Sequence, residues 1–224
     1  MRWLLLGLMM LPAEAAVFYV EAGNLPIAAT NIADPMTGAD LTGVQVTANY
    51  LGFSVAATFQ ATGATSGAAA IPGFGGPLFS LSVTGPTEAP LAWQYTSQFL
   101  SPLLSVVLDG TAAGVYFDRT GPNPGVAGSG PGADMVFSPP VSSANILVTY
   151  DRPVNWAGSP HDLFGKVTFS FPGVNGNPDG LPPNDFSFTQ DTDRTVPEPG
   201  AGMLLGIGLG LIGVRVVSRR QRVC

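Results

Sequence analysis

Glycine and proline interrupt this chain so often that short strands are favoured over long regular elements. They account for 29 and 21 of the 224 residues, while 46% of the residues are hydrophobic. This apolar content separates the chain from disordered polar sequences. Apolar segments that are broken at short intervals by turn-forming residues indicate many short strands joined by tight turns.

The apolar segments between these breaks alternate with a period of two residues. Leu163–Phe171 places Val167, Phe169 and Phe171 on one side of a strand, and Val44–Tyr50 repeats the pattern. Such alternation is typical of strands with one buried face. It predicts nine or ten strands and no amphipathic helix in the body of the chain. We therefore expect an all-β fold, an antiparallel two-sheet sandwich of jelly-roll-like form.

Turn-forming residues also predict how some of these segments are connected. Asp109-Gly110 follows the apolar run Leu103–Leu108 and precedes Val115–Phe117, which predicts a hairpin between two strands. Thr62–Gly76 consists of small residues without a period and is expected to be a loop.

The N-terminal segment Met1–Ala15 has the three parts of a secretory signal peptide. Arg2 supplies the positive charge, Trp3–Leu11 is apolar, and the small residues Ala13 and Ala15 stand where a signal peptidase reads the chain. Nine apolar residues are too few to span a bilayer. We expect export through the Sec translocon and cleavage after Ala15.

The C-terminal segment combines a short motif, an apolar run and a basic end. Pro197, Glu198 and Pro199 precede Ala201–Val217, which as a helix would be about 26 Å long and reach the lower limit for crossing a bilayer core. The basic cluster consists of Arg215, Arg219, Arg220 and Arg222. An excess of arginine marks the cytoplasmic side of a membrane span, so the body of the protein is expected outside.

This order of motif, span and basic cluster resembles the PEP-CTERM sorting signal. The resemblance implies that an exosortase-like membrane peptidase recognises Pro197, Glu198 and Pro199 and cuts the chain there or nearby. It further implies a Gram-negative bacterium that makes exopolysaccharide, and a transmembrane helix that anchors the protein only temporarily. A plain single-pass anchor is the alternative.

These ends divide the chain into a signal peptide (1–15), an exported β-sandwich domain (16–196) and a sorting tail (197–224). The exported part holds eleven aspartates and two glutamates against four basic residues, a net charge of −9. This acidic balance argues against nucleic-acid partners, which require a basic face. The only cysteine is Cys224, so the exported part contains no disulfide.

Few residues of the exported part carry a recognisable chemistry. His161 is the only histidine, no Gly-x-Ser-x-Gly motif occurs, and a zinc site lacks ligands, so no catalytic residue and no cofactor is expected. Asp191 and Asp193 could provide two ligands to calcium, but two carboxylates are too few for a site. A solvated acidic stalk before the sorting tail is the favoured interpretation of this segment.

Aromatic side chains offer a different kind of binding site. Trp93, Tyr95 and Trp156 could stack on sugar rings, although core packing is the commoner role of such residues. Trp156 lies in a proline-bounded loop and is the better glycan-stacking candidate. We expect a non-enzymatic cell-surface or matrix protein that associates with exopolysaccharide. The alternatives are a carbohydrate-binding module with a defined glycan ligand and an extracellular hydrolase.

Overall fold

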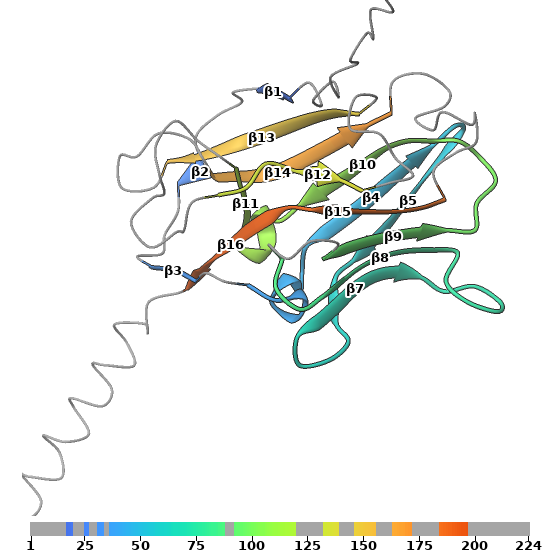
Figure 1. Ribbon diagram of the computed structural model, residues 1–224, viewed down its shortest axis with the longest axis horizontal. Coiled ribbons are helices and arrows are strands. Elements are labelled where there is room, and N and C mark those ends of the chain that lie inside the picture. Colours follow the sequence, from blue (N-terminus) through green and yellow to red (C-terminus); the bar gives the residue numbers. More distant parts are fainter. Residues whose placement is uncertain are drawn as a thin grey trace, which may run out of the picture.

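The computed structural model describes residues 17–19, 25–26, 31–33, 36–87, 92–119, 132–138, 146–155, 163–171 and 184–196. These residues form strands and two short 3-10 helices, η1 (Gly38–Leu41) and η2 (Thr111–Ala113), and no α-helix occurs among them. The strands build two sheets that pack against each other (Figure 1). The expected all-β fold with two antiparallel sheets is confirmed.

The larger sheet has ten strands and carries most of the chain. Its strands are β1 (Val17–Tyr19), β2 (Leu25–Pro26), β3 (Asn31–Ala33), β4 (Gln45–Tyr50), β5 (Phe53–Thr58), β10 (Leu103–Asp109), β11 (Val115–Asp118), β13 (Leu147–Asn155), β14 (Leu163–Ser170) and β16 (Asp191–Val196). The main path runs β3-β16-β11-β14-β10-β4-β5. β13 also pairs with β14, and only β1 and β2 run parallel to their partner β13.

The smaller sheet has six strands, all antiparallel. They are β6 (Gln60–Ala61), β7 (Ser66–Ile71), β8 (Phe79–Thr84), β9 (Trp93–Ser97), β12 (Val136–Phe137) and β15 (Asp185–Thr189). Their order is β12-β15-β9-β8-β7-β6. The sixteen strand segments exceed the nine or ten predicted, because several two- and three-residue segments pair at the sheet margins without a readable alternation.

The core between the sheets is built largely from aromatic side chains. Phe169 of β14 contacts Phe137, Phe186 and Phe188 of the opposite sheet, with ring centroids 5.1 to 6.1 Å apart. All four rings are buried. Burying a side chain of this size contributes about 1.5–3 kcal/mol, so this cluster holds the two sheets together without a disulfide. The inward positions predicted on β14 are confirmed.

The hairpin predicted at Asp109-Gly110 is wrong. β10 and β11 do not pair with each other; β10 lies antiparallel to Lys166–Ser170 of β14, and β11 lies antiparallel to Leu163 and Phe164 of the same strand. Both segments therefore run in the same direction. The chain makes a local excursion through η2 and then rejoins β14, with Val115 N–H donating to Gly110 O at 3.0 Å.

The loop predicted for Thr62–Gly76 is also wrong, because β7 forms within it. β7 consists mainly of glycine and alanine, so its sequence shows no alternation of large apolar and polar side chains. Gly67 is required by packing against η1: a Cβ atom there would lie 2.1 Å from the carbonyl oxygen of Gly38. The reason for a strand here is thus a tertiary contact, which the local pattern cannot show.

Candidate functional site

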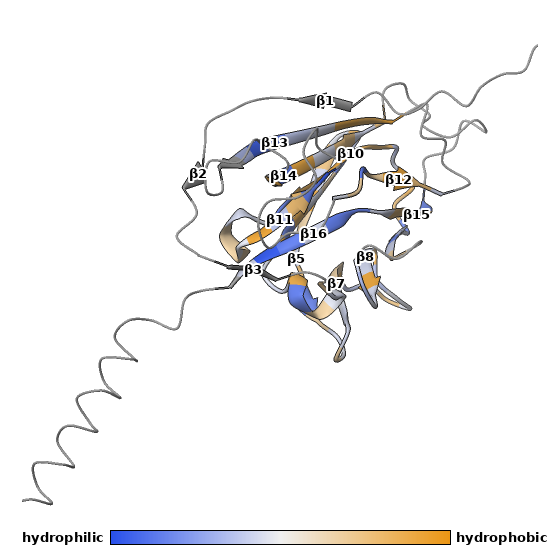
Figure 2. Cartoon of the chain, turned by 60° about the vertical axis from the view of Figure 1, so that its left-hand side comes forward, coloured by the Kyte–Doolittle hydropathy of each residue, from blue (hydrophilic) through white to orange (hydrophobic). Residues whose placement is uncertain are grey.

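The last described strand, β16, is the most polar segment of the body and is nevertheless buried. Gln190, Asp191, Thr192 and Asp193 are each at most 3% exposed. Figure 2 shows β16 as a hydrophilic strand that runs across the body beside β11. The solvated acidic stalk expected at this position is therefore wrong, because Asp191–Arg194 pair with β11 and Arg194–Val196 pair with β3.

Gln190 connects the two sheets at the point where the chain passes from β15 to β16. Its side-chain amide donates to the main-chain oxygens of Asp118 at 2.7 Å and Asp191 at 2.8 Å. The hydroxyl of Tyr150 donates to its side-chain oxygen at 2.5 Å, and the indole N–H of Trp93 donates to its main-chain oxygen at 3.2 Å. These bonds satisfy the polar groups of a residue with no solvent exposure.

Tyr150 extends this network toward the positive charge of Arg119. Burial raises the pKa of Tyr150 above its ordinary value, and its hydroxyl also accepts the main-chain N–H of Met135 at 3.3 Å. The guanidinium of Arg119 lies 5.6 Å from the centre of the Tyr150 ring. Arg119 Nε donates to Asp134 Oδ1 at 2.9 Å, which fixes the guanidinium beside the ring.

Three carboxylates share one face of the sheet next to this network. Asp118 pairs with Asp191 across β11 and β16, and Asp193 follows two residues later on the same face. Phe117 and Thr192, which alternate with them, belong to the opposite face, and Phe117 is part of the core. The three carboxylates are buried, and each one interacts with a neighbouring group.

The main chain at Gly132 packs directly onto this carboxylate group. A Cβ atom at Gly132 would lie 2.3 Å from Asp118 Oδ1, so only glycine fits there. Within the described ranges, no group of three histidine, cysteine or acidic residues is arranged to hold a metal ion. Asp118 and Asp191 are directly paired across β11 and β16, but both are buried, which gives the hydrolase alternative no support.

Two of the three aromatic candidates for sugar stacking belong to the core. Trp93 and Tyr95 have no solvent exposure; Trp93 stacks on Phe188 and Tyr95 stacks on Phe186. Core packing is therefore their role. Trp156 and His161 lie outside the described residues, so glycan stacking by Trp156 stays a prediction.

β16 leads directly into the predicted sorting tail. Val196, its last residue, pairs with Asn31 of β3, and Thr195 N–H donates to Gly114 O at 2.9 Å. In the part of the chain that the structure describes, no helix is long and apolar enough to cross a membrane. Several predicted site residues lie outside that part: Ala13, Ala15, Pro197, Glu198, Pro199, Arg215, Arg219, Arg220 and Arg222.

Sequence reasoning did not identify Gln190 as the residue that connects the sheets. Gln190 follows a strand with alternating phenylalanines and precedes a run of aspartate and threonine. In the sequence alone, this position indicates the start of a polar linker. The available signal was the β-branched residues Thr192, Thr195 and Val196, which favour a strand over a stalk.

Comparison with known proteins identifies only the C-terminal segment. The family model of the PEP-CTERM protein-sorting motif matches residues 195–222. No curated protein and no solved structure matches the chain. The matched range contains the Pro-Glu-Pro motif, the apolar run and the basic cluster, and it overlaps β16 at Thr195 and Val196.

Proposed function

We propose that this chain, whose residues 195–222 match the PEP-CTERM protein-sorting motif, carries an exported β-sandwich that is delivered to the cell surface by a tail that an exosortase-like peptidase removes. The observation that supports this proposal is the junction at Val196. The last described strand pairs first with β11 and then, up to Val196, with β3, and the Pro-Glu-Pro motif begins at the next residue. Cleavage at the motif or beyond it therefore leaves every strand of the body intact.

Intact-mass analysis of protein from the membrane fraction and from the medium tests the processing step. We expect the released protein to lack the residues that follow about Val196, and to begin at Ala16, as the signal-peptide pattern predicts. The double variant Glu198→Ala, Pro199→Ala should stay in the membrane fraction. Pro72→Ala with Pro77→Ala, in the loop before β8, is the matched control and should be released normally. A full tail on every mature molecule would leave only the plain-anchor interpretation.

We further propose a non-enzymatic role in which the body associates with exopolysaccharide. Support comes from the outward face of β5, β4, β10 and β14, called here the hydroxyl face. Its hydroxyl- and amide-bearing residues are Gln45, Thr47, Asn49, Ser54, Thr58, Ser105, Thr168 and Ser170.

Side chains on the hydroxyl face are ordered by bonds to one another. Asn49 donates to Ser105 at 2.9 Å and accepts from Ser54 at 2.7 Å, and Thr58 donates to Gln45 at 3.1 Å. Each hydroxyl and amide group has more than one bonding site, so the face retains donors and acceptors for sugar hydroxyls. Its few charges favour neutral or weakly charged chains.

A further inference from the structure

Five neighbouring strands of the larger sheet place their outward side chains in rows that cross the strands. The strands are β5, β4, β10, β14 and β13, in that order, and Figure 1 shows them side by side. Every second residue of a strand belongs to the outward face, and paired residues of neighbouring strands lie opposite one another. Neighbouring strands are about 4.8 Å apart, and neighbouring rows are about 6.8 Å apart.

The middle row carries a methyl group at every position. From β5 to β13 its members, called here the methyl row, are Ala56, Thr47, Val107, Thr168 and Thr149. All five side chains are exposed or half-buried. They form a narrow apolar track across four strand spacings, a length of roughly 19 Å.

The row on one side of this track consists of hydroxyl and amide side chains. Its members, called here the Asn49 row, are Ser54, Asn49, Ser105 and Ser170. Ser54 Oγ donates to Asn49 Oδ1 at 2.7 Å, and Asn49 Nδ2 donates to Ser105 Oγ at 2.9 Å. Both bonds run in the same direction, so the Ser105 hydroxyl keeps a proton to donate and the Ser54 oxygen can still accept one.

The row on the other side is polar as well, and its charges are paired. Its members, called here the Gln45 row, are Thr58, Gln45, Asp109, Lys166 and Asp151. Arg152 Nη1 lies 3.0 Å from Asp109 Oδ2. Lys166 Nζ lies 3.8 Å from Asp151 Oδ2. The two acids and two bases cancel, so the three rows together with Arg152 carry no net charge.

This arrangement matches the two kinds of surface that a flat sugar ring presents. A pyranose ring with equatorial substituents has an apolar C–H face and carries its hydroxyl groups around the rim. With that face on the methyl row, rim hydroxyls on both sides would approach a polar row. The row separation of about 6.8 Å accommodates half the width of the ring and one hydrogen bond of about 2.8 Å. A peptide in the same track would be held off the methyl row by its own side chains.

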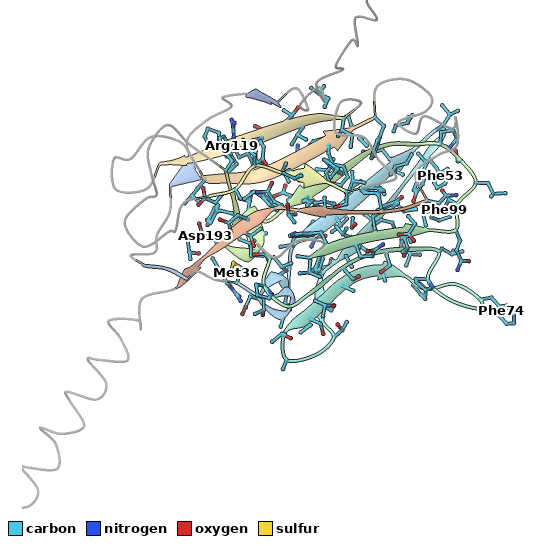
Figure 3. All side chains as sticks on the ribbon, viewed as in Figure 1. Met36, Phe53, Phe74, Phe99, Arg119 and Asp193 are labelled. Carbon is cyan, nitrogen blue, oxygen red and sulfur yellow. The ribbon has the colours of Figure 1, made fainter. Side chains whose placement is uncertain are left out.

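We propose that a linear, neutral polysaccharide of equatorially linked pyranose units lies across the five strands, with its ring faces on the methyl row. Its hydroxyl groups bond to the Asn49 row on one side and to the Gln45 row on the other. This inference rests on the proposed association with exopolysaccharide and adds the class of polymer and its direction. Figure 3 shows Phe53, the first residue of β5, and Asp193 of β16 toward opposite ends of the body. A tail that follows β16 therefore leaves the body away from the start of β5.

Two polymers with the same β-1,4-linked backbone test the class of ligand. The full chain is held in lipid nanodiscs, and its migration is measured in gels that contain hydroxyethylcellulose or carboxymethylcellulose, with empty nanodiscs as the control. We expect hydroxyethylcellulose to retard the protein and added sodium chloride to leave this unchanged, because the charges of the site are already paired. Carboxymethylcellulose should retard it less, since the exported part is acidic.

The producing cells' own exopolysaccharide separates this inference from the function on which it rests. Failure of the wild-type chain to bind that material would overturn the proposed function. Binding to that material without binding to hydroxyethylcellulose, or stronger retardation by carboxymethylcellulose, would overturn the inference alone.

A methyl-deletion variant tests the contact with the methyl row. Thr47→Ser with Thr168→Ser removes two methyl groups and keeps every hydroxyl, so a role of the hydroxyl groups alone predicts no effect. We expect the dissociation constant for hydroxyethylcellulose to rise about tenfold. Thr84→Ser with Thr96→Ser, on the outward face of β8 and β9, is the matched control and should bind normally. Equal binding by the two double variants would contradict the proposal.

Charge variants at the two ends of the methyl row test the direction of the polymer. Ala56→Asp lies on β5 and Thr149→Asp on β13, and a chain that crosses all five strands contacts both positions. We expect each variant to weaken binding, while circular dichroism confirms that it is folded. An effect at only one end, or at neither, would overturn the proposed direction.

Discussion

The hydroxyl of Tyr150 and the side-chain oxygen of Gln190 are 2.5 Å apart, and the bond between them joins β13 to the crossing between the two sheets. Both residues are buried. The sandwich therefore depends on a polar contact in its interior as well as on its aromatic core, because an interior polar group must be satisfied by protein partners.

Removing the Gln190 side chain should destabilise the protein strongly. Gln190→Ala leaves the main-chain oxygens of Asp118 and Asp191 and the hydroxyl of Tyr150 without this partner. We expect the free energy of unfolding, measured with urea, to fall by about 2–4 kcal/mol. Gln94→Ala, on the outer face of β9, should change it by less than about 1 kcal/mol. Equal effects would mean that the Gln190 bonds contribute no net stability.

Gly67→Ala should destabilise the contact between β7 and η1. The added Cβ would lie 2.1 Å from Gly38 O and 3.2 Å from Gln60 O, and both atoms are backbone. We expect a loss of about 1–3 kcal/mol in a thermal or urea unfolding experiment. Gly63→Ala meets mainly the hydroxyl of Ser66, which can rotate away, and serves as the control. A neutral Gly67→Ala would show that η1 can shift away from the sheet.

Alkaline pH should destabilise the body through its tyrosines. Burial raises the pKa values of Tyr50, Tyr95, Tyr116 and Tyr150 in the folded protein. The unfolded chain loses these protons near pH 10, before the folded protein does. Stability is therefore fully present below about pH 10 and falls as the pH rises through and above that value.

Thermal melting from about pH 8 to 12 should show this decline, and phenolate absorbance should show that folded tyrosines titrate late. Tyrosine titration at the ordinary pH without unfolding would contradict the burial of these side chains.

The hydroxyl face should contribute to polysaccharide association. Asn49→Ala with Ser105→Ala removes the bonded pair at its centre. We expect weaker co-sedimentation with exopolysaccharide of the producing cells. Ser80→Ala with Ser82→Ala, on the outer face of β8, is the matched control and should sediment like the native protein. A loss common to both variants, or to neither, would count against the hydroxyl face.

The inward positions of the main strands could be predicted because each carries large apolar side chains in alternation. Val46, Ala48 and Tyr50 of β4 are all buried as expected, as are Val167 and Phe169 of β14. At these positions the local pattern and the tertiary packing agree, so the two-residue alternation was sufficient to predict which side chains are buried.

Three features could not be predicted because tertiary contacts determine them. β7 is a strand of small residues whose Gly67 is needed by η1. Asp109-Gly110 allows a reversal, but pairing of both flanking segments to β14 keeps the chain in one direction. Asp191 and Asp193 have the composition of a linker, and their pairing with β11 shows that they belong to the sheet. The sorting tail was recognisable because its motif is local.

The two-sided pairing of β16 also determines how the body responds to force. A pull on the chain beyond Val196 acts along β16, and the hydrogen bonds to β11 on one side and β3 on the other lie across that direction. The ladders are loaded in shear and must yield together, whereas a hairpin pulled from its open end unzips one bond at a time. Tension between an anchored tail and a surrounding matrix would thus reach a mechanically resistant part of the sheet.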